Sequence, residues 1–153
     1  VITAVSRYAK LRLSPPGLGQ MLAEFMLEND GAYLSGVKEE YNHRRYVVYN
    51  RLNQMPGVTT YLPGGAFYCF ARFPVESSED FCRWLLEDFE YQGATVMLSP
   101  GQGFYATPGL GKDEVRIAYV LKETDLHAAM DCLQEALRVY SERKVGKQLV
   151  NSE

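Results

Sequence analysis

The stretch at residues 99–121, SPGQGFYATPGLGKDEVRIAYVL, constrains the fold more than any other part of the sequence. Its first half carries too many glycines and prolines for a helix and predicts a loop, whereas its second half is short, apolar and typical of a strand. Side chains on a strand alternate between its two faces, so Val115, Ile117 and Tyr119 share one face and Arg116 lies on the other. The first three residues are therefore expected to face a core, and Arg116 is expected to point away from it.

Arg116 needs an anionic partner, because a guanidinium that is left buried and unpaired beside apolar neighbours destabilises a fold strongly. Its planar fork suits a carboxylate, which it can hold through two parallel hydrogen bonds. Two explanations stay open on spacing alone. Arg116 is either structural, paired with one of the chain's 19 acidic residues or solvated at a strand end, or it binds the carboxylate of a ligand.

The composition narrows the class of protein. With 153 residues, of which 46% are hydrophobic and 23% charged, the chain is long enough for one globular domain with a core. The net charge of -3 and the lack of a basic stripe argue against a nucleic-acid partner. No apolar run reaches the roughly 20 residues of a membrane-spanning helix, so we expect a cytoplasmic protein. Two separated histidines and three separated cysteines predict no metal site and reduced, packed thiols.

The periodicity of apolar residues predicts five helices and four short strands. The helices are expected over the first dozen residues, from about 16 or 17 to 27, from about 32 to 53, from a cap at Ser77 or Ser78 to Gly93, and onward from a cap at Thr124. The strands are expected at residues 58–62, 66–73, 94–98 and 115–120.

This order of elements predicts an α+β fold with a small mixed sheet of three to four strands, covered by helices on one face. A long linking helix precedes it. We expect four parts: N-terminal helices at residues 1–31, the linking helix at 32–53, the α+β domain at 54–142, and a frayed polar tail at 143–153.

A basic cluster lies in the third predicted helix. His43, Arg44 and Arg45 follow Glu39 and Glu40 by about one helical turn. Charges four residues apart on a helix lie on the same face and form surface ion pairs. The sequence therefore predicts ion pairs on the helix surface and no chemistry for the three basic residues.

A series of motifs runs through most of the chain, from about residue 11 to 140. The segment RLSPPGLGQMLAEFML comes first, the PGGAFY turn follows at residues 63–68, and a PG..F loop with Pro100, Gly101 and Phe104 leads through further glycines to Arg116. In this order the motifs resemble the C-terminal small domain of the fold-type I, pyridoxal-phosphate-dependent aminotransferases, the aspartate aminotransferase class.

The resemblance implies roles for three residues. Arg116 would bind the α-carboxylate of the substrate, Phe67 would approach the substrate from the PGGAFY turn, and Gly103 would belong to a loop that forms a wall of the site. The resemblance also implies pyridoxal 5'-phosphate as cofactor, an amino acid and a 2-oxo acid as substrates, and a homodimeric parent enzyme whose small domain closes over the active site.

The resemblance also implies what this chain would lack. In the family, the Schiff-base lysine and the cofactor-binding residues come from a large domain that precedes the small one, and the pattern around Lys10 does not match the lysine motif. We therefore expect no catalytic and no cofactor-binding residue in this chain, helices at residues 1–31 that continue from a missing large domain, and no transamination by the chain alone.

Two other functions remain open. The same architecture serves pyridoxal-phosphate lyases and decarboxylases, which also bind an amino-acid carboxylate. A chain of this kind could also be a non-catalytic module for small-carboxylate binding or for oligomerisation. The sequence does not decide between these functions.

Overall fold

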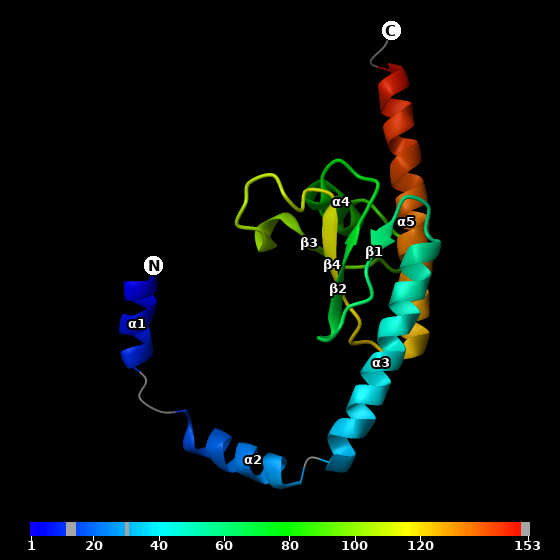
Figure 1. Ribbon diagram of the computed structural model, residues 1–153. Helices are drawn as coiled ribbons and strands as arrows, with labels where there is room; N and C mark the ends of the chain where they lie inside the picture. Colours follow the sequence, from blue (N-terminus) through cyan, green and yellow to red (C-terminus); the bar gives the residue numbers. More distant parts are fainter. Residues whose placement is uncertain (12–14, 30, 151–153) are drawn as a thin grey trace. The chain divides into compact units, whose positions relative to one another are not determined.

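The chain is represented by a computed structural model that describes residues 1–11, 15–29 and 31–150 (Figure 1). It divides into two compact units, Val1–Glu39 and Glu40–Glu153, and the division falls inside helix α3 (Gly31–Gln54). None of the helices that the structure describes combines the length and the apolar character that crossing a membrane requires.

The first unit contains α1 (Ile2–Lys10), α2 (Gly17–Glu28) and the beginning of α3. These bounds agree with the helices that the apolar spacing predicts, and Pro16 lies directly before the first residue of α2. Neither α1 nor α2 buries a single described residue, and Phe25 remains 61% exposed. The apolar stripes of these helices thus have no core within the described part of their own unit.

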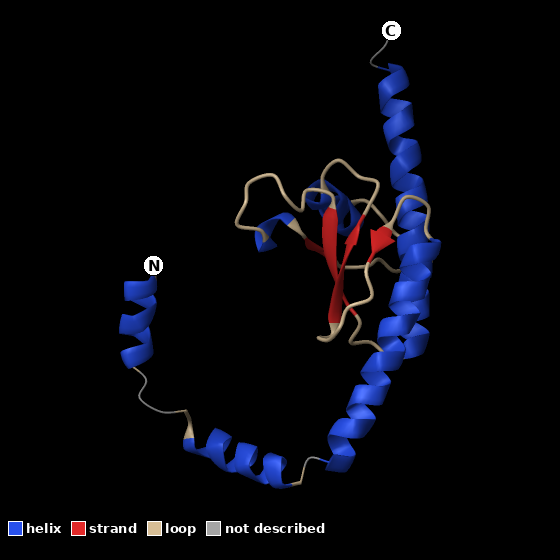
Figure 2. Cartoon of the chain, in the orientation of Figure 1, coloured by secondary structure: helices blue, strands red, loops and turns tan. Residues whose placement is uncertain are grey.

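The second unit is built on a four-stranded sheet with the strand order β1-β2-β4-β3. The strands are drawn in red in Figure 2. Its strands are β1 (Thr59–Thr60), β2 (Tyr68–Arg72), β3 (Ser99–Pro100) and β4 (Glu114–Ala118). The α+β class is confirmed, but the expectation of a mixed sheet is wrong because every neighbouring pair is antiparallel. Short connections, such as the turn between β1 and β2, return the chain in the opposite direction and favour antiparallel pairing.

Helices cover one face of this sheet, as the sequence predicts. Cys69 pairs with Ile117 and Ala71 with Val115, and these four side chains are buried on the same face. Packed against them are the end of α3 and two further helices, α4 (Ser78–Glu87) and α5 (Glu123–Val150). Leading core residues are Val48, Leu52, Phe81, Leu85, Leu126, Met130 and Leu133.

Helix α4 begins where the sequence predicts. The Ser77 hydroxyl accepts a hydrogen bond from the Asp80 backbone N–H at 3.1 Å, so Ser77 is the predicted cap. Trp84 is only 7% exposed and packs against the rings of Phe81 and Tyr140. The single tryptophan is therefore part of the core.

Helix α4 ends at Glu87, six residues before the predicted end at Gly93. Gln92 and Gly93 both have positive φ angles, and Tyr91 and Ala94 exchange backbone hydrogen bonds of 2.8 and 3.1 Å across them. Two consecutive residues of this kind form a tight reversing turn. The glycine thus marks this turn and does not end the helix.

The strand predicted at residues 94–98 is also absent from the described structure, where regular pairing begins only with β3. Residues 95–98 diverge from the end of β4, and a cavity lies between the two segments.

The last helix is longer than predicted at both ends. It begins at Glu123, so Thr124 lies in its first turn, where the Thr124 hydroxyl is 3.3 Å from Asp125 Oδ1. It continues through Val150, so most of the predicted frayed tail is helical, and residues 151–153 lie outside the described residues. The segment after residue 142 lacks apolar periodicity, but it contains no proline and is rich in good helix formers.

The buried thiols predict a loss of stability at alkaline pH. Burial raises the pKa of Cys69 from 9.0 to about 11. Because the thiol is neutral when protonated, its contribution is complete below pH 9 and is lost as the pH rises through 11, at about 3 kcal/mol in total. Urea unfolding at pH 8, 9.5 and 11 measures this effect. The free energy of unfolding of Cys69→Ala is expected to fall less steeply with pH than that of the wild type. Parallel curves for the two proteins would contradict the prediction.

Candidate functional site

Arg116 is the centre of the candidate site. It lies in the middle of β4, with Phe70 of β2 opposite on one side and Ser99 of β3 on the other. The alternation along β4 places it on the face that the helices do not cover, where it is half-buried. This position agrees with the sequence prediction.

Two aromatic rings hold the Arg116 guanidinium. Its carbon Cζ lies 4.7 Å from the ring centre of Phe104 and 5.2 Å from that of Tyr68. Phe104 in turn contacts Phe70 edge to face at 5.4 Å. Such cation–π contacts contribute about 0.5–1 kcal/mol each at partly exposed sites. They restrict the side chain but supply no oxygen to accept its hydrogen bonds.

Arg116 has no ion pair and no side-chain hydrogen bond within residues 1–11, 15–29 and 31–150. Glu114, two residues earlier on the same face, already accepts hydrogen bonds from the Tyr105 hydroxyl and from Arg72 Nη2, the latter at 3.1 Å. Arg72 Nε is also 3.3 Å from Asp113. Nearby acids are thus engaged elsewhere, and the positive charge of Arg116 is available to an external anion.

The hydrogen bond to Glu114 raises the pKa of Tyr105. The hydroxyl, which like that of any tyrosine is protonated at neutral pH, donates to the Glu114 carboxylate.

The loop after β3 brings Phe104 to the arginine. The Gly101 backbone N–H donates to the Glu114 carbonyl at 2.7 Å, and a short 3₁₀ helix, η1 (Gln102–Phe104), follows. Gly101 and Gly111 are both buried, and Gly111 has a φ of +71° that favours glycine. The loop is thus anchored on β4 at both of these glycines.

The other two predicted site residues, Phe67 and Gly103, make no ring contact or hydrogen bond with Arg116 among the described residues. Phe67 is 52% exposed, and its ring contacts Tyr68 at 5.6 Å, so Tyr68 and not Phe67 supplies the ring beside Arg116. Gly103 is exposed in η1, and a Cβ added to it would meet nothing within 4 Å. The described contacts therefore bring Arg116 together with Tyr68 and Phe104, and they include none between Arg116 and Phe67 or Gly103.

The sequence alone does not predict that the rings of Tyr68 and Phe104 contact Arg116. Phe104 belongs to the PG..F motif, and alternation places Tyr68 on the same face as Phe70. The missing information was the register of β2 against β4, which pairs Phe70 with Arg116 and brings Tyr68 within reach as a diagonal neighbour.

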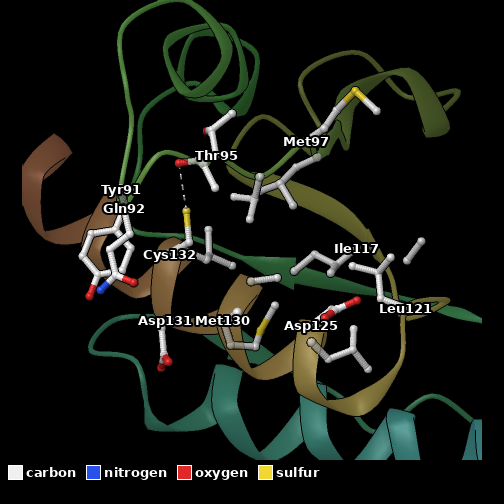
Figure 3. A pocket seen from close by; sticks show the side chains of 18 of the residues that line it. Tyr91, Gln92, Thr95, Met97, Ile117, Leu121, Asp125, Met130, Asp131 and Cys132 are labelled. Atoms are coloured by element: carbon white, nitrogen blue, oxygen red, sulfur yellow. Dashed lines mark hydrogen bonds between the residues drawn. The ribbon is translucent and has the colours of Figure 1, made fainter.

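A separate cavity of about 710 Å³ opens on the helix side of the sheet (Figure 3). Its mainly apolar wall includes Met97, Ile117, Leu121, Met130 and Cys132. Because Ile117 faces this cavity, its neighbour on the strand, Arg116, points to the opposite side. The cavity is therefore not part of the Arg116 site.

No protein-family model matches the chain, but comparison with individual known proteins finds relatives. The aspartate aminotransferase of Pyrococcus horikoshii is 40% identical over 103 residues, which is 66% of this chain and 24% of that protein. The chain thus spans about a quarter of the length of this relative.

Solved structures agree with the sequence comparison. The α-aminoadipate aminotransferase LysN of Thermus thermophilus superposes with a TM-score of 0.71 and 25% identity, over 88% of this chain and 34% of that one. The alanine aminotransferase of Pyrococcus furiosus gives a TM-score of 0.69 and 28% identity, over 89% and 33%. By sequence and by fold, the chain belongs to the aspartate aminotransferase family of fold-type I pyridoxal-phosphate enzymes and has the fold of their small domain.

Proposed function

We propose that this chain is the substrate-carboxylate half of an aminotransferase active site, acting on an amino acid and a 2-oxo acid. The observation that carries the proposal is the state of Arg116, whose guanidinium is held by two rings and has no acidic partner among the described residues. A restrained, uncompensated guanidinium is suited to a planar anion. All the relatives named above are aminotransferases, which favours transamination over lyase or decarboxylase chemistry.

Arg116 would act by binding and by orientation. Two parallel hydrogen bonds from its fork fix both oxygens of the α-carboxylate and therefore the rotation of the substrate about its Cα. Orientation of the reacting bond accelerates a reaction in addition to the binding itself. Phe67 and the loop around Gly103 would border the bound substrate at a greater distance from the carboxylate.

Pyridoxal 5'-phosphate, when bound in enzymes of this family, supplies an electron sink for the substrate's Cα. Its aldehyde requires a lysine, and its ring nitrogen requires an acid. The described contacts of Arg116 are aromatic rings and strand backbone, with no lysine among them. The surroundings of Arg116 therefore fit the substrate carboxylate and do not fit the cofactor, which we propose is held by a large domain.

The larger assembly is also part of the proposal. We infer that residues 1–31 continue from that large domain, that residues 32–53 link it to the small domain at 54–142, and that the parent enzyme is a cytoplasmic homodimer whose small domain closes over the site. The short share of each relative that the chain covers, 24% for the Pyrococcus horikoshii enzyme, supports a parent of greater length.

A labelling experiment tests this division of labour. The purified 153-residue chain is mixed with pyridoxal phosphate, reduced with borohydride and mapped by peptide mass spectrometry, and turnover of an amino acid with 2-oxoglutarate is assayed in parallel. We expect scattered, substoichiometric labelling and no turnover. Stoichiometric labelling of one lysine, or transamination by the chain alone, would contradict the proposed separation of cofactor and carboxylate sites.

A further inference from the structure

The consecutive arginines Arg44 and Arg45 of α3 make contacts beyond the surface ion pairs that the sequence predicts. Arg44 Nε lies 2.7 Å from Glu40, which confirms one surface ion pair at a spacing of four residues. Arg45 forms no ion pair within the part of the chain that the structure describes. Its Nη1 donates to the Pro63 carbonyl at 2.8 Å, and its Nη2 donates to Asn42.

Both arginines reach main-chain carbonyls at the same end of the sheet. Arg44 Nη1 donates to the Val120 carbonyl at 2.6 Å, just after β4, while Arg45 holds Pro63, just before β2. These two segments are joined directly, because the Tyr119 N–H donates to the Phe67 carbonyl at 2.9 Å. Helix α3 is thereby fastened to both chain segments that border the start of β2.

The turn between Pro63 and β2 contains backbone strain. Ala66 has a φ of +63°, a conformation that residues with a Cβ seldom adopt and that persists only where neighbouring contacts impose it. The Tyr119 hydroxyl donates to the Ala66 carbonyl at 3.1 Å, and Arg45 holds the Pro63 carbonyl three residues earlier. Arg45 and Tyr119 therefore hold the strained turn at two points.

The side chain of Arg45 is half-buried, and one of its nitrogens is in an unfavourable environment. Its Nε is buried and has no hydrogen-bond partner in the described structure, although an unpaired buried donor is unfavourable. The two Nη atoms make the only hydrogen bonds of this side chain among the described residues, and they fix it toward the turn and Asn42.

The strained turn leads directly into Tyr68, whose ring contacts Arg116. We propose that Arg45 is a positioning residue for Arg116. By holding the turn at residues 63–67 against α3, Arg45 fixes the position of the Tyr68 ring and therefore that of the Arg116 guanidinium. This proposal rests on the proposed function of Arg116 as the carboxylate ligand. It adds that the orientation of α3 controls substrate affinity through the turn.

The test compares variants of the full-length enzyme. The inhibition constant of propionate, which carries a carboxylate and no amino group, is measured against the best amino donor, together with KM, kcat and the melting temperature. Arg45→Gln is expected to raise KM and the propionate constant about fivefold, as for the loss of one to two hydrogen bonds, with kcat within about twofold. Arg45→Lys is expected to recover most of the affinity, since an ammonium can still donate to the Pro63 carbonyl.

Arg51→Gln is the matched control, because Arg51 also lies on α3 but pairs with Asp131 of α5 and, among the described residues, forms no hydrogen bond or ion pair with the turn. It is expected to leave the propionate constant unchanged even if it lowers the melting temperature. Normal propionate affinity in Arg45→Gln, or an equal loss in Arg51→Gln, would overturn the inference. Should Arg45→Gln fail to fold, the comparison is made between Arg45→Lys and Arg116→Lys. If folded Arg45→Lys binds propionate no better than Arg116→Lys does, the inference is overturned. Normal affinity in Arg116→Lys would instead overturn the proposed function, and this inference with it.

Discussion

Replacing Arg116 with lysine in the full-length enzyme is expected to lower kcat/KM for the amino donor by about a hundredfold. The positive charge is retained, so the loss of kcat/KM reports the loss of hydrogen-bond geometry. An ammonium cannot hold both carboxylate oxygens in parallel, and the substrate can therefore rotate. A misplacement of the substrate by about 1 Å costs about this factor in rate. The lysine side chain also loses the planar group that lies against Tyr68 and Phe104. Steady-state kinetics with separate kcat and KM values measure the effect.

Two further variants define what the result means. Phe104→Ala removes one ring contact and keeps the guanidinium, so it is expected to raise KM about threefold, as for one cation–π contact. Arg72→Lys changes an arginine on the same sheet face that is 59% exposed and already paired with Asp113 and Glu114, so it is expected to leave the kinetics unchanged. Wild-type kinetics in Arg116→Lys would remove Arg116 from the site.

The parts of the fold that were predictable from sequence are those controlled by local signals. The alternation in β4, the cap at Ser77 and the apolar stripes of α3, α4 and α5 each depend on a few neighbouring residues, and all three are confirmed. One of the errors occurs where a partner strand decides the outcome. Residues 95–98 are apolar enough for a strand, but strand structure requires hydrogen bonds to a neighbour, and β4 diverges from them.

The candidate site was predictable only in its central residue. An arginine on an otherwise apolar strand is conspicuous in the sequence, whereas its surroundings depend on strand register and on the path of a 13-residue connection between β3 and β4. Neither is encoded by local periodicity. The engagement of Glu114 by Tyr105 and Arg72 was equally hidden, although it removes an acid that could otherwise have neutralised Arg116.

The loop that carries Phe104 depends on one glycine in particular. A Cβ added to Gly101 would lie 2.6 Å from the carbonyl oxygen of Glu114 and 2.9 Å from its carbonyl carbon, which are backbone atoms of β4. Gly101 has an ordinary φ of −76°, so the requirement for glycine is one of space and not of backbone conformation. The loop cannot retreat without breaking the 2.7 Å hydrogen bond from the Gly101 N–H to that same carbonyl.

Gly101→Ala is therefore expected to destabilise the chain by about 3 kcal/mol, the range of overpacking against atoms that cannot move aside. Gly103→Ala is the matched control two residues away, where an added Cβ meets nothing within 4 Å, and it is expected to stay within about 0.5 kcal/mol of the wild type. Urea unfolding followed by the fluorescence of Trp84, the single tryptophan, measures both. Equal stability of the two variants would mean that the loop moves freely away from β4. Phe104 would then no longer be fixed against Arg116 by the fold, and the carboxylate site would have to be assembled by the substrate.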